Sequence, residues 1–194
     1  FDDPLFIKFW EKGKDVERQA EFVSFIGRMF VSGDNAQAKE LLAKNAQCRQ
    51  RLVDLWKWAL ENHDDSKIFA DFGFWMNTDK KVFDPSWLAE MAKKTLEKTT
   101  GFLEWDYALV KGIVELAKAN ATDTLEIIRL HLLEGGVRGG KMRLPFMYDD
   151  EWVEALNILY SNDETKNATY TLIDSLIREG GSTFWKFKRV IGEK

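Results

Sequence analysis

The sequence predicts an all-α protein, and two observations lead to this fold class. Apolar residues recur at the three- and four-residue spacing of one helix face along most of the chain. No stretch of strictly alternating apolar and polar residues is long enough for a strand. Two of the apolar stripes comprise Phe22, Phe25, Ile26, Met29 and Phe30, and Trp105, Leu109, Ile113, Leu116 and Ala117.

The composition predicts one packed domain over residues 1–194. Hydrophobic residues make up 45% of the chain and aromatic residues 13%, which is enough to fill a sizeable core and excludes a disordered chain. Only three Pro occur, as expected for a helical protein.

Caps and helix breakers divide the first half of the chain into helices. Gly33 ends one apolar stripe, and Asp34 or Asn35 can cap the helix that follows. Asp84-Pro85 places a capping side chain before a Pro at the first helical position, where the missing N–H has no penalty. The helices predicted here cover residues 4–12, 15–32, 35–44, 46–62, 65–77 and 85–99.

Similar signals divide the second half. Gly101 suits the position after a helix end, and Gly180-Gly181 closes the last long helix. Asp123 and Glu126 have the spacing of a capping box. The helices predicted here cover residues 104–119, 123–135, 150–161 and 164–179, and a short terminal helix starts near Thr183.

About ten short helices in series predict a HEAT-like α–α solenoid with two layers of helices. A weak internal similarity has a spacing of about 47 residues, within the range of HEAT repeats. It relates Phe25-Ile26-Gly27 to Phe72-Gly73. The chain starts at Phe1 without a signal-peptide pattern, so we expect a cytoplasmic protein. We interpret the chain as the C-terminal part of a longer one.

Charge and cysteine content argue against several classes of function. The formal net charge of −4 and the pI of about 5.4 make nucleic acid an unlikely partner. Cys48 is the only cysteine, so neither an internal disulfide nor a zinc-binding set can form. No apolar run approaches the ~18 residues of a membrane span, so we expect no membrane partner.

The motifs that could carry chemistry favour structural roles. Residues 135–141 fit G-x-x-x-x-G-K, but Met142 stands where a P-loop has the Ser or Thr that binds Mg²⁺. His63-Asp64-Asp65 could begin a metal site, but His131 is the only other histidine. Asp64 or Asp65 is better explained as a helix cap. We therefore expect no catalytic residue, no metal site and no cofactor.

The connection over residues 134–149 is the predicted partner-binding site. Four Gly and one Pro predict a long loop, which is uncommon inside a compact domain. Its cations could steer the encounter with a partner protein, while apolar residues beside them give affinity. The residues assigned to this role are Arg138, Lys141, Arg143 and Phe146, and the alternative is a solvated connection.

Aromatic residues cluster at Phe72-Gly73-Phe74-Trp75, which is too dense for a single helix face. We expect either Phe74 or Trp75 to cover a neighbouring helix pair or a partner chain. Trp87 and Trp152 each begin an amphipathic stripe and are expected to pack between helix layers.

Several of these segments, in this order, resemble the C-terminal helical regions of large bacterial STAND- or NACHT-like NTPases. Residues 72–75 and 83–88 resemble their "FGWW … F-D-x-x-W" stretch. Residues 168–176, with Gly180-Gly181 and Phe184, resemble their closing "A-x-x-L-I-x-x-L-x-x-x-G" segment. Residues 125–133 and 150–156 resemble two helices in between, and the likeness covers about residues 68–190.

Many proteins of this family are thought to act in antiphage defence, with the ATPase and the effector upstream. The resemblance therefore implies a non-catalytic helical scaffold or sensor. Its partner would be another protein or other domains of the same chain. No Walker motif is present to carry over an activity. Two alternatives remain open, namely a nucleic-acid-binding helical repeat and a small helical enzyme.

Overall fold

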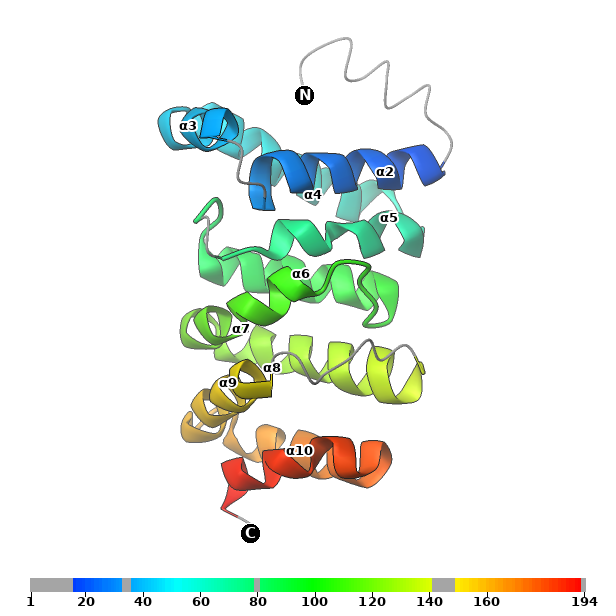
Figure 1. Cartoon of the computed structure of the whole chain (residues 1–194), viewed down its shortest axis with the longest axis vertical. Helices are drawn as coiled ribbons and strands as arrows, with labels where there is room; N and C mark the ends of the chain where they lie inside the picture. The colour runs from blue at the N-terminus through cyan, green and yellow to red at the C-terminus, as the bar shows by residue number, and fades with distance from the viewer. Residues whose placement is uncertain (1–15, 33–35, 79–80, 141–148, 193–194) are drawn as a thin grey trace.

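The computed structural model describes residues 16–32, 36–78, 81–140 and 149–192. About 84% of this part is helical, and it contains no strand, which confirms the all-α class. The helices lie one above another along the longest axis, following chain order from the N-terminal to the C-terminal end (Figure 1). Among the described residues, no helix has the length and apolarity needed to cross a membrane.

Most predicted helices are present near their expected bounds, except that the one predicted at 4–12 lies outside the described residues. The N-terminal elements are α2 (Val16–Ile26) with its π-helical continuation η1 (Gly27–Ser32), α3 (Ala36–Lys44), α4 (Ala46–Asn62), and α5 (Ser66–Ala70) with its 3-10 continuation η2 (Asp71–Met76). The C-terminal elements are α6 (Pro85–Thr99), α7 (Tyr107–Ala119), α8 (Ala121–Ile128) with its π-helical continuation η3 (Arg129–Arg138), α9 (Asp149–Ser161), α10 (Lys166–Gly180), and the 3-10 helix η5 (Gly181–Ile191).

Two of the predicted helix starts can be compared with their caps. Asp84 caps α6 as predicted, because its carboxylate accepts hydrogen bonds from the backbone N–H groups of Ser86 and Trp87, both at 3.0 Å. The prediction that Asp123 caps a helix, in a capping box with Glu126, is wrong. The cap of α8 is Asn120, whose side chain accepts from the Asp123 N–H at 3.1 Å, so the helix begins two residues earlier than predicted.

An aromatic cluster packs α2, α4, η2 and α6 together near the N-terminal end of the stack. Trp56 of α4 is fully buried and stacks on Phe72 of η2, with ring centroids 5.1 Å apart. Its indole N–H donates to the Thr95 hydroxyl of α6 at 2.9 Å, and the Trp75 indole donates to the Val23 carbonyl of α2 at 2.9 Å. Both buried indoles are therefore satisfied while they tie neighbouring layers together.

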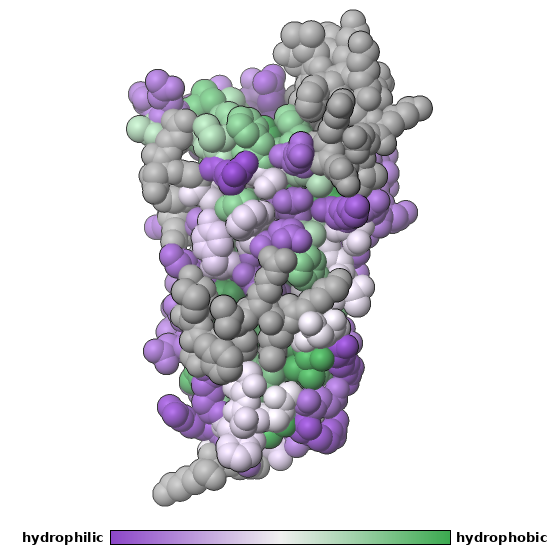
Figure 2. Space-filling model, turned by 45° about the vertical axis from the view of Figure 1, so that its right-hand side comes forward, coloured by the Kyte–Doolittle hydropathy of each residue, from purple (hydrophilic) through white to green (hydrophobic). Residues whose placement is uncertain are grey.

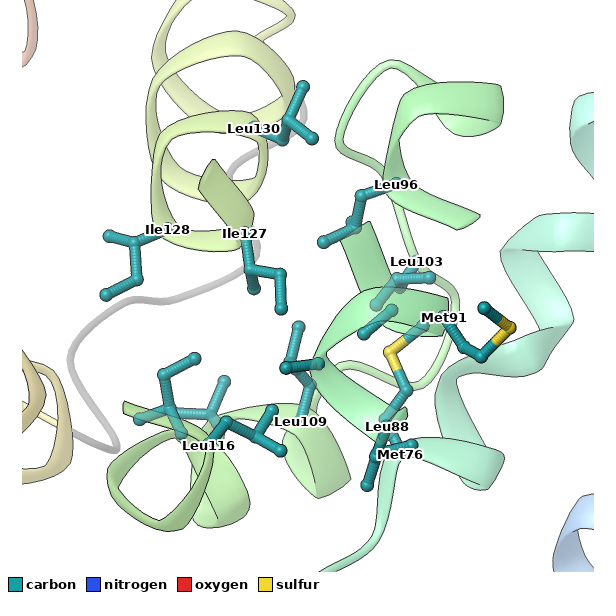
Figure 3. Close-up of a cluster of buried hydrophobic side chains, with 14 of the residues drawn as sticks. Met76, Leu88, Met91, Leu96, Leu103, Leu109, Leu116, Ile127, Ile128 and Leu130 are labelled. Carbon is teal, nitrogen blue, oxygen red and sulfur yellow. The ribbon is translucent and has the colours of Figure 1, made fainter. Parts of the chain in front are cut away.

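In the middle of the stack, the core is mainly aliphatic. Buried side chains from α6, α7 and the α8–η3 helix point toward one another (Figure 3). They form one continuous hydrophobic cluster with the aromatic residues, which gives the described chain a single core. The labelled residues include Leu88, Met91 and Leu96 of α6, Leu109 and Leu116 of α7, and Ile127, Ile128 and Leu130 of α8–η3.

The prediction of a loop over residues 134–149 is wrong for its first residues, because η3 continues to Arg138. Gly135 is buried in this helix, where a Cβ atom would lie 2.7 Å from the backbone carbonyl carbon and oxygen of Gly101. A Cβ on Gly101 would lie 1.9 Å from the Leu130 carbonyl oxygen. These glycines therefore permit close helix packing and do not mark a flexible loop.

Candidate functional site

A cleft of about 660 Å³ lies at the N-terminal end of the stack, between α2–η1 and α5–η2. One wall is α2–η1, the opposite wall is α5–η2, and residues from the end of α6 and the turn before α7 close one side. Charged side chains of both signs line it, namely Glu21, Arg28, Lys67, Asp71 and Glu104.

Asp71, at the start of η2, is a partly buried carboxylate of this cleft. Burial raises the pKa of Asp71 above its ordinary value, and the nearby Glu104 shifts the pKa in the same direction. Hydrogen bonds from the Ser24 hydroxyl and the Trp105 indole, together with the Arg28 charge, oppose this shift. Asp71 thus lies in the cleft with Ser24 of α2 and with Trp105 of the turn before α7.

Trp105 forms an exposed aromatic surface at the cleft. Its ring stacks on Phe74 at a centroid distance of 4.9 Å and an interplanar angle of 27°, and 43% of the residue remains exposed. The Arg28 guanidinium carbon lies 6.0 Å from the centroid of the same Phe74 ring. A Cβ on Gly73 would lie 2.3 Å from the Trp105 carbonyl oxygen, so the turn rests directly on η2.

These contacts bear on two predictions, the helix assigned to Trp105 and the packing of Phe74 and Trp75. Trp105 is not part of the helix stripe that continues with Leu109, because α7 begins only at Tyr107. Both Phe74 and Trp75 are buried. Trp75 belongs to the aromatic core, whereas Phe74 packs on Trp105 and Tyr107 next to α7.

The predicted partner-binding residues are only partly within the described structure. Arg138 ends η3 and donates two hydrogen bonds to Glu179 of α10, at 2.8 and 2.9 Å, and one to Glu134 at 2.8 Å. The hydrogen bonds to Glu179, followed by the charges of both carboxylates, raise the pKa of Arg138 above its ordinary value. Arg138 therefore links η3 to α10, while Lys141, Arg143 and Phe146 lie outside the described residues.

The histidine and acidic motif has a structural explanation. Asp65 caps α5 by accepting from the Lys67 N–H at 2.9 Å, and Asp64 pairs with Lys98 of α6. His131 Nδ1 lies 3.0 Å from the Gly101 carbonyl oxygen, and the ring stacks on Trp152. Within the described ranges, no three His, Cys, Asp or Glu side chains are grouped to hold a metal ion.

The G-x-x-x-x-G-K motif also differs from a nucleotide-binding loop. Its first two residues, Gly135 and Gly136, are buried inside η3, and Lys141 lies outside the described residues. A P-loop instead uses glycines ahead of a helix, so that backbone N–H groups face phosphate.

Sequence reasoning missed the cleft itself. Ser24, Asp71 and Trp105 are far apart in the sequence and meet only through packing. The sequence did contain a signal for the position of Trp105. Asp is a typical residue just before a helix, and a helix that begins after Asp106 leaves Trp105 in the preceding turn.

No family model, curated protein or solved structure matches the chain. A function must therefore be argued from the geometry of the cleft and from the order of the helices.

Proposed function

We propose that the chain is a HEAT-like solenoid that serves as a non-catalytic protein-recognition module. In this proposal it belongs to the C-terminal helical region of a larger bacterial STAND- or NACHT-like NTPase, which acts in the cytoplasm in antiphage defence. The motif order over residues 68–190 supports this assignment. The stacking of helices in chain order (Figure 1) supports the solenoid, because repeat proteins make most contacts between neighbouring units.

The observation that carries the recognition role is the exposed Trp105 beside a cleft of mixed charge. Tryptophan and arginine dominate binding energy at protein interfaces, and a fixed side chain loses little entropy on binding. Trp105 is held by its stacking on Phe74 before any partner arrives. Charges of both signs around it would select a partner segment of complementary pattern.

The N-terminal end of the stack offers a second surface for contact with a partner or with other domains of the same chain. Phe25 and Met29 of α2–η1 and Leu41 of α3 are exposed, at 49%, 36% and 44%. Figure 2 shows hydrophobic side chains gathered at this end of the molecule. Exposed apolar groups that lie together favour an interaction surface.

The proposal can be tested with peptides selected from a random display library on the immobilised chain. Calorimetry would then measure their affinity for the wild type and for Trp105→Ala. Loss of a central interface tryptophan should weaken binding about 30-fold, corresponding to about 2 kcal/mol. Trp185→Ala is the matched control, because that tryptophan is exposed on η5, away from the cleft. Selected peptides that bind Trp105→Ala as tightly as the wild type would contradict recognition at the cleft.

A further inference from the structure

The aromatic wall of the cleft is a tryptophan with one face already covered. The Trp105 ring stacks on Phe74 with centroids 4.9 Å apart and an interplanar angle of 27°, yet 43% of the residue is exposed. Because Phe74 covers one face, the exposed area of the ring lies on the opposite face and the edge. The face of an indole carries the negative part of the ring quadrupole, so it attracts cations and repels anions.

The backbone holds two carboxylates beside this ring. The Glu104 N–H donates to the Ala70 carbonyl at 2.9 Å, which places Glu104 next to the residue that precedes Asp71. A Cβ on Gly73 would lie 2.3 Å from the Trp105 carbonyl oxygen. The turn before α7 therefore runs along the start of η2, and both carboxylates line the cleft together with Trp105.

The charges of the cleft favour a cationic ligand. Among the described residues that line it, three are carboxylates and two are cations, namely Glu21, Asp71 and Glu104 against Arg28 and Lys67. Burial raises the pKa of Asp71, and the charge of Glu104 raises it further, by more than the charge of Arg28 lowers it. The nearby charges therefore sum to a negative potential at Asp71.

We propose that the cleft binds an arginine side chain of its protein partner, with the guanidinium stacked on the face of Trp105 opposite Phe74 and paired with the Asp71 carboxylate. This inference rests on the proposed function and names the residue that the partner supplies. A guanidinium is planar, stacks on aromatic rings and presents its donors in a fork that matches a carboxylate. A volume of about 660 Å³ also leaves room for residues on either side of the arginine.

Two other kinds of partner side chain suit the cleft less well. An acidic or phosphorylated side chain would bring its negative charge against the Trp105 face and against the carboxylates, and both would repel it. An apolar side chain could stack on Trp105, but it would remove the Asp71 carboxylate from water without supplying a donor, which is unfavourable.

Fluorescein-labelled heptapeptide pools test the proposal on the full chain. Each pool has random residues around a fixed central residue, which is arginine, its neutral isostere citrulline, lysine or glutamate. Fluorescence anisotropy should show the arginine pool binding about tenfold more tightly than the citrulline pool, because the charge supplies both the cation–π attraction and the ion pair. Lysine keeps the charge without the planar stacking group, so its pool should lie between these two, and glutamate should bind most weakly.

Variants of the chain locate the arginine site. Trp105→Ala should weaken binding of the arginine pool about tenfold. Asp71→Asn should reduce the preference for arginine over citrulline to about threefold, because only the charged side chain forms an ion pair. Matched controls are Trp185→Ala, which removes an exposed tryptophan of η5, and Asp54→Asn, which removes an exposed carboxylate of α4. Neither control should change the preference, and circular dichroism would verify that each variant is folded.

The outcomes separate this inference from the proposed function. If Trp105→Ala weakens binding but the citrulline or glutamate pool binds as tightly as the arginine pool, the cleft recognises protein without arginine, and only the inference is overturned. An unchanged preference in Asp71→Asn would also overturn the inference alone. If no pool binds, or if the arginine pool binds Trp105→Ala like the wild type, recognition at the cleft is overturned as well.

Discussion

At the scale of single residues, Asp71 shows how burial and hydrogen bonding compete. Its carboxylate is partly buried beside Glu104, while the Ser24 and Trp105 side chains and the charge of Arg28 oppose the effect of burial on its pKa. Asn has the same shape as Asp and carries no charge. The charge of Asp71 can therefore be removed while the shape of the side chain is kept.

Asp71→Asn should change the pH dependence of stability in a defined direction. Burial raises the folded-state pKa above the ordinary value of 3.8, so the folded state holds this proton more tightly. The resulting stabilisation is full below pH 3.8 and is lost as pH rises through the folded-state value. Urea unfolding of both proteins from pH 3 to pH 7 should show the variant gaining stability relative to the wild type. A difference that stays constant with pH, or runs the other way, would contradict the burial effect.

Tryptophans at different depths should respond very differently to truncation. Trp152 of α9 is only 2% exposed, and its ring stacks on His131, so Trp152→Ala should cost about 3–5 kcal/mol. Trp185→Ala, at a site 62% exposed, should change the free energy of unfolding by less than about 0.5 kcal/mol. Chemical denaturation would measure both, and similar losses would show that burial does not set the difference.

At the scale of elements, glycines determine how closely helices approach. Gly135 of η3 and Gly112 of α7 are both helical, so Ala should have the same intrinsic advantage at each. Their surroundings differ. A Cβ at Gly135 meets the backbone of Gly101 at 2.7 Å, whereas one at Gly112 meets the side-chain ends of Thr78 at 2.7 Å.

Gly135→Ala should therefore destabilise the protein more than Gly112→Ala. Backbone cannot move aside without separating η3 from the turn after α6, and overpacking of this kind costs about 1–3 kcal/mol. The Thr78 side chain can rotate, so the loss at Gly112 should be smaller. Thermal or urea unfolding of the two variants gives the comparison. Equal losses would show that helix propensity, and not backbone contact, dominates.

The same elements show what the sequence can and cannot predict. Spacings of three and four residues predicted α4, α6 and α10 closely, because one face of each helix is buried. Trp105 was assigned to a helix because its apolar spacing extends the α7 stripe, although that helix begins after Asp106. The cleft could not be predicted, since Ser24, Asp71 and Trp105 meet only after layers separated in sequence have packed.

At the scale of the whole molecule, stability should vary along the stack. Central helices bury faces against layers on both sides, whereas α2–α3 and η5 have only one neighbouring layer in the described structure (Figure 1). Residues of α6, α7 and α8, such as Leu96, Ile113 and Ile127, are fully buried. Exposed apolar groups such as Phe25 and Trp185 occur at the ends.

Native-state hydrogen exchange should therefore show graded protection. In a protein built from layers, end layers can open while the middle stays folded, because each layer depends mainly on its neighbours. Amides of α6–α8 should exchange only through global unfolding, and those of α2 and η5 through openings of lower free energy. Mass spectrometry over a denaturant series would separate these classes. Uniform protection at the global value would mean that the helices unfold as one cooperative unit, which would contradict the proposed solenoid.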